Sequence, residues 1–198
     1  EGDAFCLQSD RGAFSARILV IATGSQALTL QDFPIPEAAK SRVLYEILPV
    51  LGVEGRRFAI VGAGDLAFDY ALNLGKRNAV TILNRVSETR CLPLLRQRAE
   101  ANPRISYREN TWVEGVRQAP QGELQLACRS PQGEMSLPCD YLVGAIGRKP
   151  QLDFLSEEDL RHAAGWQQEG RLHLIGDVKN QQYRQASIAI GDGVMAAM

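Results

Sequence analysis

The stretch RFAIVGAGDLAFDYALNLGKRNAVTILNRVSETR, residues 57–90, decides the fold. Phe58–Val61 is a short apolar run of the kind that a strand buried on both faces requires. Residues 62–67 then read Gly-Ala-Gly-Asp-Leu-Ala, and the pattern beyond them predicts a helix over about residues 65–75. Ala79–Leu83 predicts a second strand. A strand, a glycine turn, a helix and a strand together predict a dinucleotide-binding unit.

Each small residue of this turn has a separate physical role in such a unit. Gly62 permits the tight turn, Gly64 lets the backbone approach a pyrophosphate, and Ala67 lets the helix pack closely on the strand. Asp65 and Leu66 fill the variable positions between them. The free N–H groups and the positive end of the helix dipole would then face the phosphates. The alternative is that the glycines serve packing alone.

The end of the second strand predicts which nucleotide fits. An NAD site usually places Asp or Glu there to hold the ribose 2′-hydroxyl. Here the position falls near Asn84, followed by Arg85 and, five residues later, Arg90. Two guanidinium groups could bind a 2′-phosphate through paired hydrogen bonds. We therefore expect NADP(H), with NAD(H) possible, unless both arginines merely solvate a loop.

Composition excludes several other functions. The chain has 198 residues, a net charge of −1 and 45% apolar residues, with no basic run typical of nucleic-acid binding and no apolar run long enough to span a membrane. Its four scattered cysteines form no CxxC, which favours free thiols in a reducing cytoplasm. His162 and His173 have no convincing partner in the sequence. We therefore predict no metal site and no catalytic side chain.

The rest of the chain predicts a mixed α/β arrangement. Before the glycine turn we expect a hairpin (residues 4–9 and 13–17), a buried strand (18–21) that ends at Thr23 and Gly24, and a helix over residues 41–51 capped by Ser41. After the turn we expect a helix (93–101), a strand (104–107), a three-stranded meander (111–118, 123–129 and 134–137) and a strand (141–145). The remaining chain predicts a polar, weakly helical stretch to Gly170, a strand (171–175) and an apolar helix (187–198). Because the chain lacks an initiator Met and ends within a helical pattern, we expect a piece of a longer protein.

Several of these elements together resemble a known family. The residues are Ala22-Thr23-Gly24, Gly62 to Ala67, Ala145-Ile146-Gly147, Gly176-Asp177, and Tyr183-Arg184-Gln185-Ala186. In order and spacing they resemble the FAD-dependent pyridine nucleotide-disulfide oxidoreductases, in the low-molecular-weight thioredoxin reductase branch. The resemblance implies a Rossmann-like three-layer NADPH domain with an antiparallel meander, residues 30–150. This domain would be inserted into an incomplete FAD-binding domain of the same type, residues 1–29 and 151–198.

The resemblance also implies roles for individual residues. Asp177 would contact the ribityl and diphosphate part of FAD, and Arg184, Gln185 and Ala186 would lie beside its ring system. Ile146 and Gly147, like Thr23 and Gly24, belong to the family's nucleotide-binding turns. Arg85 and Arg90 match the first and last arginines of the family's His-Arg-Arg-x-x-x-Arg pattern for the 2′-phosphate. Asn84 and Val86 depart from that pattern, which weakens the NADPH preference without reversing it.

Two larger departures affect the expected function. Leu44–Glu54, where the family carries its redox-active CxxC, contains no cysteine, and the family's first GxGxxG for FAD would precede Glu1. We therefore expect a parent flavoprotein, a homodimer by resemblance, that passes hydride from NADPH to FAD and electrons to a redox protein or a small molecule. Ferredoxin, flavodoxin or a protein disulfide would fit. The isolated chain is expected neither to retain FAD nor to be active. The alternative is a non-catalytic NAD(P)H sensor or interaction module.

Overall fold

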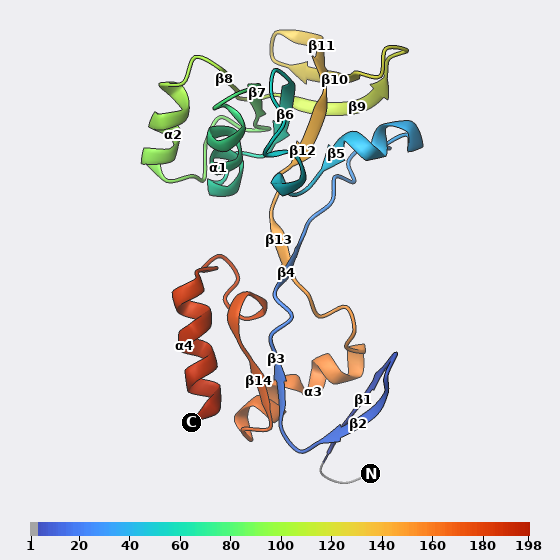
Figure 1. Cartoon of the computed structure of the whole chain (residues 1–198), viewed down its shortest axis with the longest axis vertical. Coiled ribbons are helices and arrows are strands. Elements are labelled where there is room, and N and C mark those ends of the chain that lie inside the picture. Colours follow the sequence, from blue (N-terminus) through green and yellow to red (C-terminus); the bar gives the residue numbers. More distant parts are fainter. Residues whose placement is uncertain (1–3) are drawn as a thin grey trace. The chain divides into compact units, whose positions relative to one another are not determined.

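The computed structural model describes residues 4–198, which form two compact units (Figure 1). The central unit is Ala27–Gly147. The terminal unit combines the chain up to Gln26 with Arg148–Met198. The domain boundaries expected from the sequence, after residues 29 and 150, lie three residues beyond these divisions. Two short strands, β4 (Ser25–Ala27) and β13 (Arg148–Pro150), pair where the chain passes between the units.

A parallel five-stranded sheet forms the middle of the central unit. Its strand order is β5-β12-β6-β7-β8, and the register is parallel at every pairing. The strands are β5 (Val43–Leu44), β12 (Tyr141–Gly144), β6 (Arg57–Val61), β7 (Ala79–Leu83) and β8 (Ile105–Arg108). The expected strand, glycine turn, helix and strand are therefore confirmed, with β6 and β7 as neighbours.

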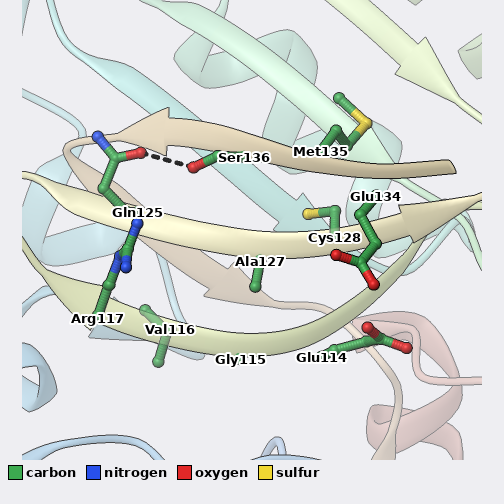
Figure 2. A pocket seen from close by; sticks show the side chains of 10 residues that line it. All are labelled: Glu114, Gly115, Val116, Arg117, Gln125, Ala127, Cys128, Glu134, Met135 and Ser136. Carbon is green, nitrogen blue, oxygen red and sulfur yellow. Dashed lines mark hydrogen bonds between the residues drawn. The ribbon is translucent and has the colours of Figure 1, made fainter.

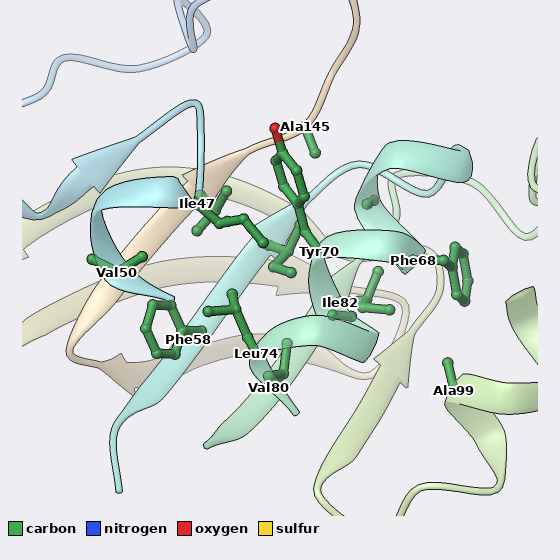
Figure 3. Close-up of a cluster of buried hydrophobic side chains, with 14 residues drawn as sticks. Ile47, Val50, Phe58, Phe68, Tyr70, Leu74, Val80, Ile82, Ala99 and Ala145 are labelled. Carbon is green, nitrogen blue, oxygen red and sulfur yellow. The ribbon is translucent and has the colours of Figure 1, made fainter. Parts of the chain in front are cut away.

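Each face of this sheet is covered by a different layer. The helices α1 (Asp65–Leu74) and α2 (Pro93–Glu100) pack against one face (Figure 3). The antiparallel meander of β9 (Trp112–Gln118), β10 (Leu124–Ser130) and β11 (Gly133–Cys139) packs against the other. Residues of β6 alternate between these layers: Phe58 and Ile60 face the helices, and Ala59 and Val61 face the meander. This is the predicted three-layer Rossmann-like fold with its meander.

One predicted helix of the central unit is wrong. Residues 41–51 form the end of a 3-10 helix, η1 (Glu37–Arg42), then β5, and then a second 3-10 helix, η2 (Leu48–Val50). Ser41 lies inside η1 and caps nothing. Val43 and Leu44 are drawn into the sheet because they pair with β12, and Pro49 cannot donate a backbone hydrogen bond. Tertiary pairing thus overrode the local pattern.

The terminal unit holds a smaller core. The hairpin of β1 (Phe5–Ser9) and β2 (Gly12–Ala16) forms as predicted, and β3 (Leu19–Ile21) pairs in parallel with β14 (Leu172–Leu174). Around them lie α3 (Glu157–Gln168), the 3-10 turn η3 (Gly176–Val178) and α4 (Ala186–Ala197). The described core centres on Ile21, Leu172 and Val178, with Trp166 packed edge-on against Phe5.

Two sequence expectations for this unit need correction. The strand at residues 18–21 is not buried throughout: Ile21 is buried, whereas Ile18 and Val20 are 60% and 47% exposed. The reason is that β3 has only β14 beside it in the described chain. In addition, the stretch up to Gly170, for which the sequence predicts only weak helicity, contains the regular twelve-residue helix α3. Its N-terminus is fixed by a capping box between Ser156 and Asp159.

Leu74 tests how much the helical layer contributes to stability. Its side chain, on α1, is 1% exposed and packs against β6 and β7 in the core of the central unit. We expect Leu74→Ala to lower the free energy of unfolding by about 2–5 kcal/mol, because it leaves a cavity. Leu94→Ala on α2 is the matched control, since Leu94 is 54% exposed and should change stability by less than about 1 kcal/mol. Urea unfolding followed by circular dichroism measures both; equal effects would contradict the packing described.

Candidate functional site

The glycine turn after β6 is packed too closely for any other residue at its first position. Gly62 has φ +124°, and a Cβ placed on it would lie 2.2 Å from the carbonyl oxygen of Ala145, just after β12. The Gly62 N–H donates to the carbonyl of Leu83 at the end of β7 (3.0 Å). The turn is therefore clamped between the carboxyl ends of the two strands that flank β6.

The second glycine of the turn is open where the first is closed. Gly64 is the N-cap of α1, and a Cβ on it would meet no atom within 4 Å. No cap from a side chain occupies this helix end. The N–H of Ala67 donates to the carbonyl of Gly64 (3.0 Å), so in the first turn of α1 the N–H groups of Asp65 and Leu66 are available to an anion. Ala67 is fully buried, and Leu66 is half-buried against the same core, which fits their expected packing roles.

Arg90 is tied to this turn through its backbone. Its N–H donates to the carbonyl of Ala63 (3.2 Å), and Arg90 and Gly64 form an isolated parallel bridge. Two residues later the N–H of Leu92 donates to the Asp65 carboxylate (2.7 Å). The exposed guanidinium of Arg90 is therefore carried on a segment fixed to the N-terminus of α1, as a phosphate-binding arginine would require.

Asn84 and Arg85, at the end of β7, have different surroundings. Asn84 is buried, and its amide donates to the Glu88 carbonyl (2.8 Å) and to the Tyr107 hydroxyl (2.9 Å). It therefore shapes the loop internally. Arg85 is exposed and lies 3.4 Å from the carboxylate of Asp32, a residue that no sequence pattern indicates.

A hollow of about 390 Å³ adjoins Arg85. Val61, the last residue of β6, is in its lining together with Arg85, Leu30, Asp32, Phe33, Trp112, Val113, Glu114 and Arg129. Its position beside the ends of β6 and β7 is the edge where parallel sheets bind nucleotides. Trp112 was missed as a candidate because its strand belongs to the meander, and no local pattern links that strand to the glycine turn.

A larger hollow, of about 480 Å³, follows the meander and shares Glu114 with the first. Figure 2 shows it along β9, β10 and β11, where Gly115 and Ala127 leave a trough between longer polar side chains. Arg117 and Gln125 stand at one end, and Glu134 stands at the other. It contains none of the residues predicted to bind a nucleotide. Size therefore does not identify the site in this unit.

The remaining predicted residue pair of the central unit follows β12. Ile146 packs against the core on the meander side, and Gly147 has φ +124°. The carbonyl of Gly147 accepts a hydrogen bond from the N–H of Leu28 (2.9 Å). Through the contact of Ala145 with Gly62, this turn lies next to the glycine fingerprint. The structure thus gathers the predicted residues of the central unit along one edge of its sheet.

In the terminal unit, Thr23 and Gly24 form the turn after β3. The Thr23 hydroxyl donates to the carbonyl of Gln151 (2.6 Å), and the Gly24 carbonyl accepts from the Gln151 N–H (3.0 Å). Gly24 adopts φ +73°, which favours glycine. Both residues therefore anchor the segment that follows β13.

Asp177 lies in a loop that α4 holds in place. The carboxylate of Asp192 on α4 accepts hydrogen bonds from the Gly176 N–H (2.9 Å), the Lys179 ammonium (2.9 Å) and the Asn180 amide. These donors, Lys179 first, lower the pKa of Asp192 to about 2. Within residues 4–198, no hydrogen bond or ion pair of the Asp177 carboxylate is found, so it is available to a ligand.

Arg184 precedes α4 and carries an unsatisfied donor. Its Nη2 donates to the Arg148 carbonyl (3.3 Å), but its buried Nε has no partner in the described structure. Gln185 is the N-cap of α4, and Ala186 is the first residue of that helix. A buried N–H without a partner is costly, and a bound acceptor would remove that cost.

The cysteines are separate free thiols throughout the described chain. Cys128 and Cys139 are buried in the meander, and burial raises the pKa of the Cys128 thiol to about 11 and that of Cys139 to about 12. Cys6 is exposed, and Cys91 is half-buried. Among residues 4–198 there is also no cluster of three or more potential metal ligands, and no helix is both long and apolar enough to cross a membrane.

Gly62 and Gly64 provide a matched test of the turn. We expect Gly62→Ala to destabilise the fold by about 2 kcal/mol or more, since the new methyl group meets the Ala145 carbonyl and φ is positive. Gly64→Ala has open space and should change stability by less than about 1 kcal/mol. Thermal unfolding of both variants measures this difference. Similar melting temperatures for the two would show that the close contact does not exist.

Asp192 should make the terminal unit sensitive to acid. Because its folded pKa of about 2 lies below the ordinary 3.8, its carboxylate stabilises the fold above about pH 4. That contribution disappears as the pH falls toward 2. We expect Asp192→Asn to increase hydrogen exchange at residues 176–180 at neutral pH and to flatten the acid dependence of stability between pH 4 and 2. Asp10→Asn, in the exposed hairpin turn, is the control; an unchanged acid profile for Asp192→Asn would refute the role.

The chain is similar to known proteins in sequence. A model of the family described as pyridine nucleotide-disulphide oxidoreductase matches residues 3–193. The thioredoxin reductase of Chlamydia pneumoniae is 24% identical over 98% of this chain and 68% of its own length, and that of Streptomyces coelicolor is 32% identical over 92% and 61%. A ferredoxin–NADP reductase of Lactobacillus delbrueckii subsp. bulgaricus is 25% identical over 60% of this chain and 39% of its own length.

Solved structures show the same fold. The thioredoxin reductase of Lactococcus lactis superposes with a TM-score of 0.85 at 23% identity, and that of T. acidophilum with 0.79 at 18%. Each alignment covers all of this chain and 69% of the solved chain. Among the first curated relatives, this chain spans between 57% and 68% of their length. By its fold and by a family match over nearly all of its residues, the chain belongs to the pyridine nucleotide-disulphide oxidoreductase family, in its thioredoxin reductase-like branch.

Proposed function

We propose that this chain is the NAD(P)H-binding part, with portions of the FAD-binding part, of a flavin-dependent oxidoreductase. In the full-length protein, hydride would pass from NADPH to FAD, and electrons would leave to an acceptor outside the chain. The observation that carries the proposal is the open N-terminus of α1 at Gly64, with the Arg90 segment bridged to it. Backbone N–H groups and a nearby cation are what a pyrophosphate requires.

The residues of the central unit fit a dinucleotide. Gly64 offers space where a Cβ would stand, so a phosphate can approach the backbone. Arg85 and Arg90 flank the loop that follows β7, and they would bind a ribose 2′-phosphate at this edge of the sheet. Gly62 fixes the turn against Ala145, which keeps the end of α1 in register with the end of β12. Nicotinamide and flavin supply the hydride chemistry when bound, and the protein binds and orients them.

The terminal unit offers groups suited to part of a flavin. Asp177 has an available carboxylate on a loop fixed by Asp192, which suits a ligand hydroxyl. The buried Nε of Arg184 lacks an acceptor, which suits a carbonyl or ring nitrogen. Both features support the roles that the family resemblance implies for these two residues.

The acceptor is proposed to be a separate redox protein or a small molecule. A dithiol relay needs two cysteines close enough to form a disulfide and at least one accessible thiolate. Residues 44–54 contain no cysteine, and burial raises the pKa of Cys128 to about 11 and that of Cys139 to about 12, so neither supplies a thiolate at neutral pH. The similarity to a ferredoxin–NADP reductase supports an acceptor of the ferredoxin or flavodoxin type.

A calorimetric titration of the 198-residue chain with NADPH and with NADH tests the nucleotide site. We expect NADPH to bind more tightly, and Arg85→Ala to weaken NADPH by about tenfold or more while changing NADH little, since it removes a charge-assisted hydrogen bond. Gly64→Ala should weaken both nucleotides at unchanged fold stability. Arg98→Ala, an exposed arginine on α2, is the matched control. If neither nucleotide binds, the assignment of this unit is wrong.

A further inference from the structure

Asp32 lies beside the arginine that was expected to bind the 2′-phosphate. Its carboxylate oxygen is 3.4 Å from Nη1 of Arg85, although the two residues are 53 positions apart in the sequence. Asp32 is held in this place by its neighbours. Leu30 and Phe33 are each only 6% exposed and pack in the core cluster that contains Val61. The backbone at residue 32 is therefore fixed at this sheet edge, and the exposed carboxylate extends from it toward Arg85.

The hollow beside these residues is electrically balanced. Of its four charged lining residues, Arg85 faces Asp32, and Arg129 faces Glu114 at 2.7 Å. Arg129 also lies over the ring of Trp112, 6.0 Å from its centre. A site built only for a 2′-phosphate would present unopposed cations to its two negative charges. Here each arginine of the lining already has an acidic partner.

A carboxylate at this place has a known chemical use in nucleotide recognition. It accepts a hydrogen bond from the ribose 2′-hydroxyl of NADH, and it repels a 2′-phosphate. Sites of this type usually supply the carboxylate from the end of the second strand. In this chain that position is Asn84, whose amide is buried and used within its own loop. Asp32 brings a carboxylate to the neighbouring arginine from a different segment.

We propose that Asp32 determines the cofactor specificity of the nucleotide site, an inference that rests on the function proposed above. Its carboxylate binds the 2′-hydroxyl of NADH and competes with the 2′-phosphate of NADPH for Arg85. Both side chains of the pair are more than 60% exposed, so the pair is weak and is displaced at small cost. The site therefore accepts both nucleotides, and Asp32 keeps its preference for NADPH small.

The test compares dissociation constants for NADPH and NADH in four proteins: the unmodified chain, Asp32→Asn, Arg85→Ala and the double variant. Asp32→Asn should raise the preference for NADPH over NADH by about five- to tenfold, because a like charge near the phosphate is removed. In the Arg85→Ala background, Asp32→Asn should change the logarithm of the NADPH-to-NADH preference by at most half as much, since the competition for Arg85 is gone. Glu37→Gln, an equal charge change five residues further along the chain, at the start of η1 and outside the hollow, is the matched control.

The outcomes separate this inference from the proposal on which it rests. If both nucleotides bind and Asp32→Asn leaves their ratio unchanged, the specificity role of Asp32 is overturned and the nucleotide site stands. If Glu37→Gln shifts the ratio equally, the effect is one of net charge, and the role is likewise overturned. If neither nucleotide binds the unmodified chain, the nucleotide site and this inference both fall. Near-ultraviolet circular dichroism checks that each variant is folded.

Discussion

The approach of Gly62 to the carbonyl of Ala145 is the constraint on which the central unit depends. At this contact the turn after β6 touches the chain that leaves β12, at a distance that no Cβ allows. The end of α1 is thereby fixed relative to two strands at once. Gly62 and the buried Ala67 make the close packing contacts on either side of Gly64, so the space beside Gly64 stays empty. One glycine secures the structure, and the next leaves room for a ligand.

The terminal unit is organised by polar contacts more than by its core. Its described core cluster has three fully buried side chains, Ile21, Leu172 and Val178. The loop that carries Asp177 is held by three donors that converge on Asp192. A carboxylate that accepts several hydrogen bonds strongly favours its charged form, and the low pKa of Asp192 reflects this. Local electrostatics therefore positions the residue that the family resemblance selects for FAD.

The sequence predicted most reliably what is decided locally. The glycine turn, α1 and the meander follow from residue types within a few positions of one another, and each formed as expected. The helix predicted over residues 41–51 is wrong at Val43 and Leu44, because their pairing with β12 depends on residues about a hundred positions away. Exposure of Ile18 and Val20 depends on how many strands flank β3, which their own apolar character does not reveal.

Asp32 could not have been found from the sequence for a related reason. Asp is common in connections, and nothing around residue 32 indicates a partner 53 positions away. The two arginines of the loop, by contrast, match a motif that the sequence alone displays. A motif identifies groups that attract a ligand, but the three-dimensional structure also shows what already neutralises them. Arg90 faces no acidic group in the described chain, whereas Arg85 faces Asp32. Preference between two nucleotides that differ by one phosphate depends on that difference in surroundings, because the attraction of a cation for phosphate is reduced by every carboxylate beside it.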